Sequence, residues 1–144
     1  MYCYKYPHPA VTADCIVYSR EGNKLSILLI KRKNPPYKDC WAFPGGFVNI
    51  DESAEEAAVR ELKEETGLEI SNIEQLKAYS NPDRDPRERV ITIAFIAESL
   101  NREVKGGDDA KEAKWFPIDN LPPLAFDHEL ILKDALNKIK ILIE

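Results

Sequence analysis

The stretch from Gly46 to Leu68 reads GFVNIDESAEEAAVRELKEETGL. Ser53, followed three residues later by Glu56, matches a capping box and predicts that a helix begins here. The interior is rich in Ala, Glu, Leu and Lys, which favour helix, and Gly67 stands where a C-cap belongs. The stretch therefore predicts a helix over Ser53–Thr66 that follows a glycine-containing turn.

Three glutamates of this helix, Glu61, Glu64 and Glu65, fall within an arc of about 100° when the chain turns by 100° per residue. One interpretation is a solvated face on which Arg60 and Lys63 offset the negative charge. The glycine pair just upstream favours a metal site instead, because carboxylate and backbone carbonyl oxygens are the ligands that Mg²⁺ or Mn²⁺ prefers. A bound metal ion would also remove the repulsion between the carboxylates.

Apolar and β-branched runs on both sides of this helix predict strands. They span Val11–Tyr18, Leu25–Lys31, Ile73–Tyr79, Val90–Glu98 and Ala113–Phe116. An apolar stripe predicts a closing helix over Asp127–Ile143, which His128 is expected only to cap or start. This order predicts an α/β fold in which a mixed sheet is sandwiched between helices.

The composition is that of a globular protein. A length of 144 residues predicts one domain, spanning residues 1–144. A net charge of −5 argues against a nucleic-acid polymer as partner. The sequence shows no apolar run long enough to span a membrane and no secretory signal, and its three cysteines have neither disulfide-framework nor zinc-site spacing. A cytoplasmic location with reduced thiols is expected.

The 46–68 stretch resembles the Nudix box, G-x5-E-x7-R-E-U-x-E-E-x-G-U, where U is aliphatic. Its constrained positions are all filled, by Gly46, Glu52, Arg60, Glu61, Leu62, Glu64, Glu65, Gly67 and Leu68. The resemblance implies the Nudix fold and Mg²⁺-dependent hydrolysis of a nucleoside diphosphate linked to a second moiety, with Mn²⁺ as an alternative metal.

Carried over by position, the resemblance makes Glu61, Glu64 and Glu65 metal ligands, with the Gly45 carbonyl as a further one. It implies that Arg60 orients a glutamate, either Glu56 or Glu61, by a charge-assisted contact. Glu52 is expected to brace the connection between loop and helix.

The general base is left open between Glu61 and Glu64, because coupled carboxylates share their titration. In some branches of the family the base lies outside the box. Glu112, expected in a polar loop just before Trp115, is therefore a further candidate. An exposed loop glutamate without a catalytic role is an equal alternative for it.

Outside the box the chain resembles the ADP-ribose pyrophosphatase branch, through WAFPGGFV, NPDRDPRERVITIAF and DDAKEAKWFPIDNLPPLAFDH. Arg84 and Arg87 are expected to pair with substrate phosphate, since guanidinium groups suit phosphate geometry. An ordinary polar turn is the alternative. Arg32 is a further candidate for a phosphate contact, although an arginine at a strand end is often only exposed.

An adenine ring needs an aromatic or apolar slot. Phe43 and Phe47, which flank the glycine pair, are the preferred candidates, and Tyr37 or a residue of a partner subunit are alternatives. A homodimer is a further expectation, because relatives in this branch complete the substrate site across a dimer. The N-terminal Tyr2–Tyr6 segment has the reach to contact a neighbour.

Two other functions stay open. One is another Nudix specificity, for an oxidised nucleoside triphosphate or a nucleotide sugar. The second is a non-catalytic module that senses ADP-ribose, as in regulators that carry an additional winged helix. With the sequence ending at Glu144, no winged helix is expected, and an intact box favours catalysis.

Overall fold

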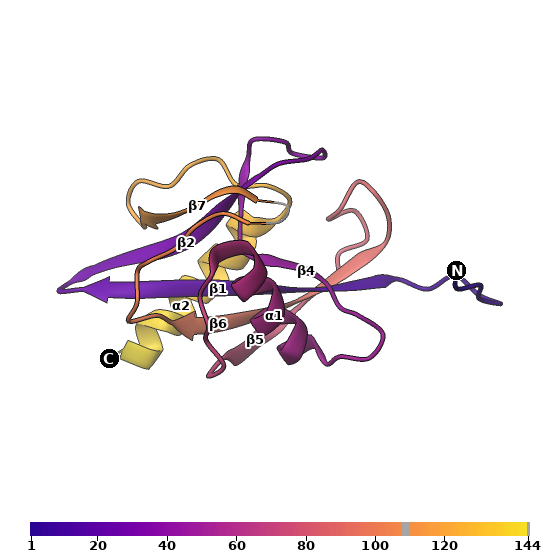
Figure 1. Ribbon diagram of the computed structural model, residues 1–144, viewed down its shortest axis with the longest axis horizontal. Helices are drawn as coiled ribbons and strands as arrows, with labels where there is room; N and C mark the ends of the chain where they lie inside the picture. The colour runs from indigo at the N-terminus through magenta and orange to yellow at the C-terminus, as the bar shows by residue number, and fades with distance from the viewer. Residues whose placement is uncertain (108–109, 144) are drawn as a thin grey trace.

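The computed structural model describes residues 1–107 and 110–143. Over these residues the chain forms one mixed sheet and two helices (Figure 1). The strands are β1 (Ala10–Glu21), β2 (Lys24–Arg32), β3 (Trp41–Ala42), β4 (Gly45–Phe47), β5 (Glu74–Tyr79), β6 (Val90–Glu98) and β7 (Ala110–Pro117). The helices are α1 (Ala54–Thr66) and α2 (His128–Ile143).

The long strand β1 organises the sheet. The order along the main path is β3-β2-β1-β6-β5, with β4 paired to β1 and β7 paired to β2. The β1 and β6 strands run parallel, whereas the other pairs are antiparallel. The sheet is therefore mixed, as the sequence predicted.

The two helices cover opposite faces of this sheet, with α1 in front of it and α2 behind it in Figure 1. Side chains alternate between the faces of a strand, and β1 shows this clearly. Its Cys15 and Val17 pack in one core with Leu62 of α1, whereas Ile16 packs in a second core with Ile131 of α2. The predicted sandwich of a sheet between helices is confirmed.

The predicted capping signals operate in α1. The Ser53 side chain accepts a hydrogen bond from the Glu56 amide, and the Glu56 carboxylate accepts one from the Ser53 amide, so the capping box is complete. At the other end Gly67 has φ 82°, the left-handed conformation that glycine adopts without strain. These caps fix the first and last turns of the helix that carries the acidic residues.

Two strands differ most in extent from the prediction: β1 continues to Glu21, three residues beyond the predicted end at Tyr18, and β7 begins earlier than predicted. The strand predicted over Ala113–Phe116 begins at Ala110, so Glu112 lies in β7, opposite Lys31 of β2, and not in a loop. Pairing with β2 provides the backbone hydrogen bonds that the polar sequence alone did not signal. Within residues 1–107 and 110–143, neither helix has the length and apolar content needed to cross a membrane.

Candidate active site

A cleft of about 360 Å³ opens beside β4 and the second half of α1. Its walls come from segments far apart in the sequence: β1, β2 and the loop after it, β4, α1, the loop before β6, and the start of α2. Of the residues expected at the site, the following line the cleft: Arg32, Phe43, Gly45, Phe47, Glu61, Glu65, Arg84 and Arg87. The fold therefore brings the acidic helix and the expected substrate loop to one place.

Glu65 connects α1 to β4. It is only 4% exposed, and its Oε1 accepts a hydrogen bond of 2.8 Å from the Gly45 amide. Gly45 lies opposite Asp14 of β1, where a side chain would collide with both the Asp14 carboxylate and the Ala13 carbonyl. Glycine at this position thus allows β4 to lie close against β1 with its amide directed at Glu65.

Gly46 makes room for a second carboxylate. A Cβ atom at this position would lie 2.6 Å from the Glu61 carboxylate, closer than such atoms approach in proteins. The first glycine of the box therefore has a steric reason: it lets the acidic side chain reach the backbone of β4. Glu61 and Glu65 lie one turn apart and both line the cleft.

Arg60 forms ion pairs with several carboxylates on and before α1. It forms ion pairs with Glu52, at 2.5 Å, with Glu61, at 2.8 Å, and with Glu64, at 3.2 Å. It also donates to the Phe47 carbonyl at 3.1 Å. Arg60 therefore contacts Glu61, whereas Glu56 belongs to the capping box; that Arg60 orients Glu61 for catalysis stays a prediction.

Glu52 braces the loop as expected. Hydrogen bonds from Arg60 and from the Asn49 amide lower its pKa to about 2. The pKa of Arg60 is raised chiefly by its hydrogen bonds with Glu52. Both groups are therefore charged at neutral pH, and the ion pair joins the loop before α1 to the middle of the helix.

The donor chemistry of this corner fits a divalent cation. The carboxylates of Glu61 and Glu65 face the cleft beside the backbone of Gly45 and Gly46, and such hard oxygen donors suit Mg²⁺ or Mn²⁺. Glu64 is not among the residues that line the cleft, and its side chain is 40% exposed. Among the described residues no three acidic, histidine or cysteine side chains converge as a ligand cluster.

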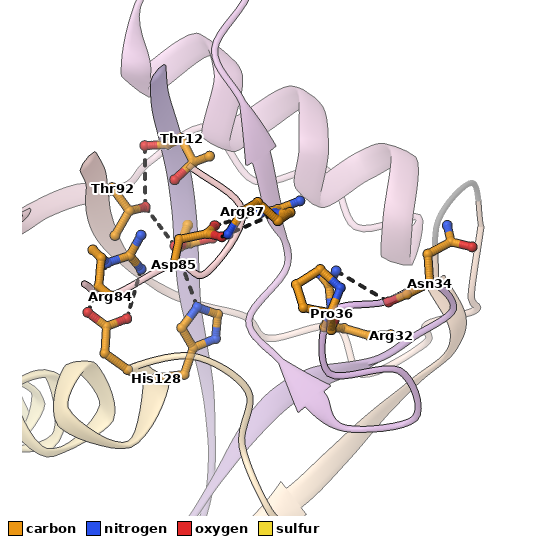
Figure 2. A network of polar contacts seen from close by, with 11 residues as sticks. Thr12, Arg32, Asn34, Pro36, Arg84, Asp85, Arg87, Thr92 and His128 are labelled. Carbon is orange, nitrogen blue, oxygen red and sulfur yellow. Dashed lines mark hydrogen bonds and ion pairs between the residues drawn. The ribbon is translucent and has the colours of Figure 1, made fainter. Parts of the chain in front are cut away.

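Arg84 lines the cleft, but its guanidinium is already paired with a carboxylate, whereas it was expected to pair with substrate phosphate. Its side chain is 4% exposed and forms a double hydrogen bond with Asp127, at 2.7 and 2.9 Å, just before α2 (Figure 2). Such a forked pair is strong and directional. The contact ties the loop before β6 to the start of α2, which gives Arg84 a structural role whether or not it also meets phosphate.

The Arg87 side chain is more exposed to solvent than the Arg84 side chain. It donates to the buried Asp85 carboxylate. Burial alone would raise the pKa of Asp85, but the hydrogen bonds and the charge of Arg87 outweigh burial, so the pKa of Asp85 is lowered. The guanidinium lies over the rings of Phe47 and Phe126, with its carbon 5.4 and 5.5 Å from their centroids. A guanidinium close to two aromatic rings that line the cleft suits an anionic ligand with a flat base.

The remaining expected residues differ in accessibility. Phe47 is 42% exposed, whereas Phe43 is only 2% exposed and is stacked on His128 at 4.8 Å. Arg32 donates to the Pro36 carbonyl at 2.8 Å and lies over Phe126. Glu112 is exposed on β7 and is not among the residues lining the cleft.

Sequence reasoning assigned no site role to several residues that line the cleft, among them Asp14, Phe126 and His128. Asp14 did carry a signal, because a carboxylate in the middle of the apolar run Val11–Tyr18 has to be buried or face a site. Phe126 and His128 carried no pattern that distinguishes a cleft residue from a core residue, and only the packing of α2 brings them there.

These features define a class, and the chain belongs to it: the NUDIX domain family, whose model matches residues 8–135. An ADP-ribose pyrophosphatase of Methanocaldococcus jannaschii is 58% identical over 131 residues, covering 91% of this chain and 75% of that protein.

Two solved structures extend the comparison. A MutT/nudix family protein from Enterococcus faecalis has a TM-score of 0.89 at 37% identity, over 96% of this chain and 65% of that chain. The NUDIX domain of Shewanella oneidensis NrtR, complexed with ADP ribose, has a TM-score of 0.87 at 29% identity, over 93% and 90%. Nudix hydrolases generally use divalent metal ions, in agreement with the oxygen donors of the cleft.

Proposed function

We propose that this protein is a Mg²⁺-dependent hydrolase that cleaves ADP-ribose to AMP and ribose 5-phosphate. The observation that carries the proposal is the convergence of two carboxylates, Glu61 and Glu65, with the Arg87 guanidinium and the exposed Phe47 ring around one cleft. The 58% identity to an ADP-ribose pyrophosphatase supports the same substrate.

The metal ion would be held by Glu61, Glu64 and Glu65, with the Gly45 carbonyl as a further ligand. When bound, Mg²⁺ or Mn²⁺ neutralises phosphate oxygens and makes water more acidic. The protein contributes fixed positions: Arg60 holds Glu61 and Glu64, and the Gly45 amide holds Glu65. A proton acceptor is then available at Glu61 or Glu64, and the exposed Glu112 on β7 is the weaker candidate.

Binding of the nucleotide follows from the other wall of the cleft. Arg87 offers a guanidinium to the diphosphate, and the Arg32 guanidinium also lies over the Phe126 ring. The exposed face of Phe47 offers a stacking surface to adenine. Arg84 holds the loop in place through Asp127.

A second function is favoured by one comparison. The NrtR domain that resembles this chain was crystallised with ADP ribose, so binding without turnover is an alternative. The complete set of box glutamates and the ion pairs of Arg60 support hydrolysis over sensing.

A substrate panel tests the proposal. ADP-ribose, an oxidised nucleoside triphosphate and a nucleotide sugar should be compared with Mg²⁺, with Mn²⁺ and with EDTA. The proposal expects the highest kcat/KM for ADP-ribose and no turnover in EDTA. A higher kcat/KM for another member of the panel would keep the reaction and change the substrate. The cytoplasmic location and the homodimer stay predictions, the latter to be checked by light scattering.

A further inference from the structure

The floor of the cleft holds two buried polar side chains that the proposed hydrolysis does not use. Asp14, on β1, is 7% exposed, and His128, the first residue of α2, is 3% exposed. Both line the cleft, and the Asp14 Oδ2 and His128 Nε2 atoms are 3.8 Å apart. This distance is too long for a direct hydrogen bond.

The contacts of His128 assign its proton. The Phe43 amide donates to Nδ1 at 3.2 Å, so Nδ1 carries a lone pair and the proton of the neutral ring is on Nε2. Burial lowers the pKa of His128, which favours this neutral form. The stacking of the ring on Phe43 fixes its plane. His128 thus presents a fixed N–H donor.

Asp14 presents the matching acceptor. Its Oδ2 accepts a hydrogen bond of 2.6 Å from the Thr92 hydroxyl, and its Oδ1 lies against Gly45, which has no side chain to cover it. The carboxylate is therefore held in place and keeps capacity to accept another hydrogen bond.

The hydrogen-bond partners of the buried atoms indicate whether a ligand can reach this pair. Among the described residues no fully buried side-chain nitrogen or oxygen atom lacks a hydrogen-bond partner. The His128 Nε2 atom has no acceptor within hydrogen-bond distance in that part of the chain, so it is reached from the cleft. A buried residue with an unpartnered donor facing a cavity is costly unless a ligand or water satisfies it.

We propose that Asp14 and His128 form a subsite for a ribose hydroxyl of the nucleotide, which donates to Asp14 and accepts from the Nε2–H group of His128. A hydroxyl is both donor and acceptor at one oxygen, and at the usual distance of about 2.8 Å one oxygen reaches both atoms. The subsite rests on the proposed function only in that the ligand carries ribose.

The base is a poorer occupant of this floor. Adenine needs an exposed flat surface, and the Phe43 ring here is already covered by His128. The exposed aromatic face lies at Phe47, near Arg87. The cleft thus separates a stacking surface at its mouth from a polar floor that suits a sugar.

Binding in EDTA tests the subsite without requiring hydrolysis. Calorimetry would compare ADP-ribose with analogues that each lack one hydroxyl of the adenosine ribose or of the terminal ribose, and with one that carries hypoxanthine in place of adenine. One deoxy analogue should bind about tenfold more weakly than ADP-ribose. The analogue that does so identifies the ribose at the floor.

Two variants connect this difference to the residues. His128→Asn keeps an acceptor for the Phe43 amide but removes the Nε2 donor, and Asp14→Leu removes the acceptor. In each, the deoxy analogue should bind within about twofold of ADP-ribose. Asp134→Leu is the matched control, since Asp134 also accepts a hydroxyl hydrogen bond, from Tyr79 at 2.8 Å, but does not line the cleft. It should retain the wild-type difference.

The subsite would be overturned if the wild type bound all ligands equally or bound none of them. It would also be overturned if the weaker binding of the deoxy analogue persisted in His128→Asn, or if only the hypoxanthine analogue bound more weakly. If Asp14→Leu does not fold, His128→Asn alone decides. Absence of ADP-ribose turnover with Mg²⁺ would refute the proposed hydrolysis and leave the binding comparison intact.

Discussion

The amide of Gly45 and the carboxylate of Glu65 are joined by a hydrogen bond of 2.8 Å across 20 residues of sequence. This contact connects the backbone of β4 to α1 at the point where the proposed metal ligands gather. It holds a buried carboxylate in place beside the cleft, so the acidic helix and the glycine pair act as one unit.

Replacement of Glu65 by Gln should lower kcat for ADP-ribose at saturating Mg²⁺ by about 100-fold or more, because the change keeps the size of the side chain but removes a ligand charge. Circular dichroism should show an unchanged fold. Glu55→Gln, at an exposed position of the same helix, is the control and should retain activity. Near-normal kcat for Glu65→Gln would remove it from the ligand set.

Gly46→Ala should reduce kcat by about 100-fold with little loss of stability. The new methyl group would displace the Glu61 carboxylate, which can rotate away at low energetic cost but leaves its working position. Gly22→Ala should instead lower stability and leave kcat unchanged. Its φ of 64° disfavours alanine, for a cost of about 1 kcal/mol, and no atom of the cleft is near. Equal activity of both variants would contradict the steric role of Gly46.

The pKa of Glu52 predicts an acid-dependent contribution to stability. In the unfolded chain this group takes up a proton near 4.5, but in the folded protein only near pH 2. Its contribution is therefore complete above pH 4.5 and is lost as the pH falls toward 2. The difference in unfolding free energy between wild type and Glu52→Gln, measured in urea, should shrink over this range. A constant difference would mean that the Arg60 pair has no such role.

Substitution should distinguish the roles of the two arginines of the substrate loop. Arg84→Ala leaves the Asp127 carboxylate unpaired and should cost about 3 kcal/mol of stability. Arg87→Ala should mainly raise KM for ADP-ribose, since its guanidinium faces the cleft over Phe47. Thermal melting and steady-state kinetics of both variants check this. A larger KM effect for Arg84→Ala would restore it as a phosphate contact.

The local elements were predictable because their signals are local. The capping box and Gly67 gave the bounds of α1 nearly to the residue, and the β-branched run Val90–Glu98 gave β6. The beginning of β7 was missed because it depends on pairing with β2 and not on its own polar sequence.

The site was most predictable where one motif contains it, although Arg32, Arg84 and Arg87, outside the box, also line the cleft. The box indicated the carboxylates and their arginine, but the partner of Arg84 lies 43 residues away at Asp127. Charge pairs of this kind depend on how loops meet in three dimensions, which composition does not record. The floor of the cleft, formed by Asp14 and His128 from opposite ends of the chain, was also missed: His128 depends on the packing of α2, whereas the signal of Asp14 within an apolar run was not used.

Product analysis of ADP-ribose incubated with the wild-type protein tests the central claim most directly. With Mg²⁺, AMP and ribose 5-phosphate should appear in equal amounts, and EDTA should abolish both. Intact ADP-ribose after prolonged incubation with Mg²⁺, or products other than this pair, would contradict hydrolysis of its diphosphate at this cleft.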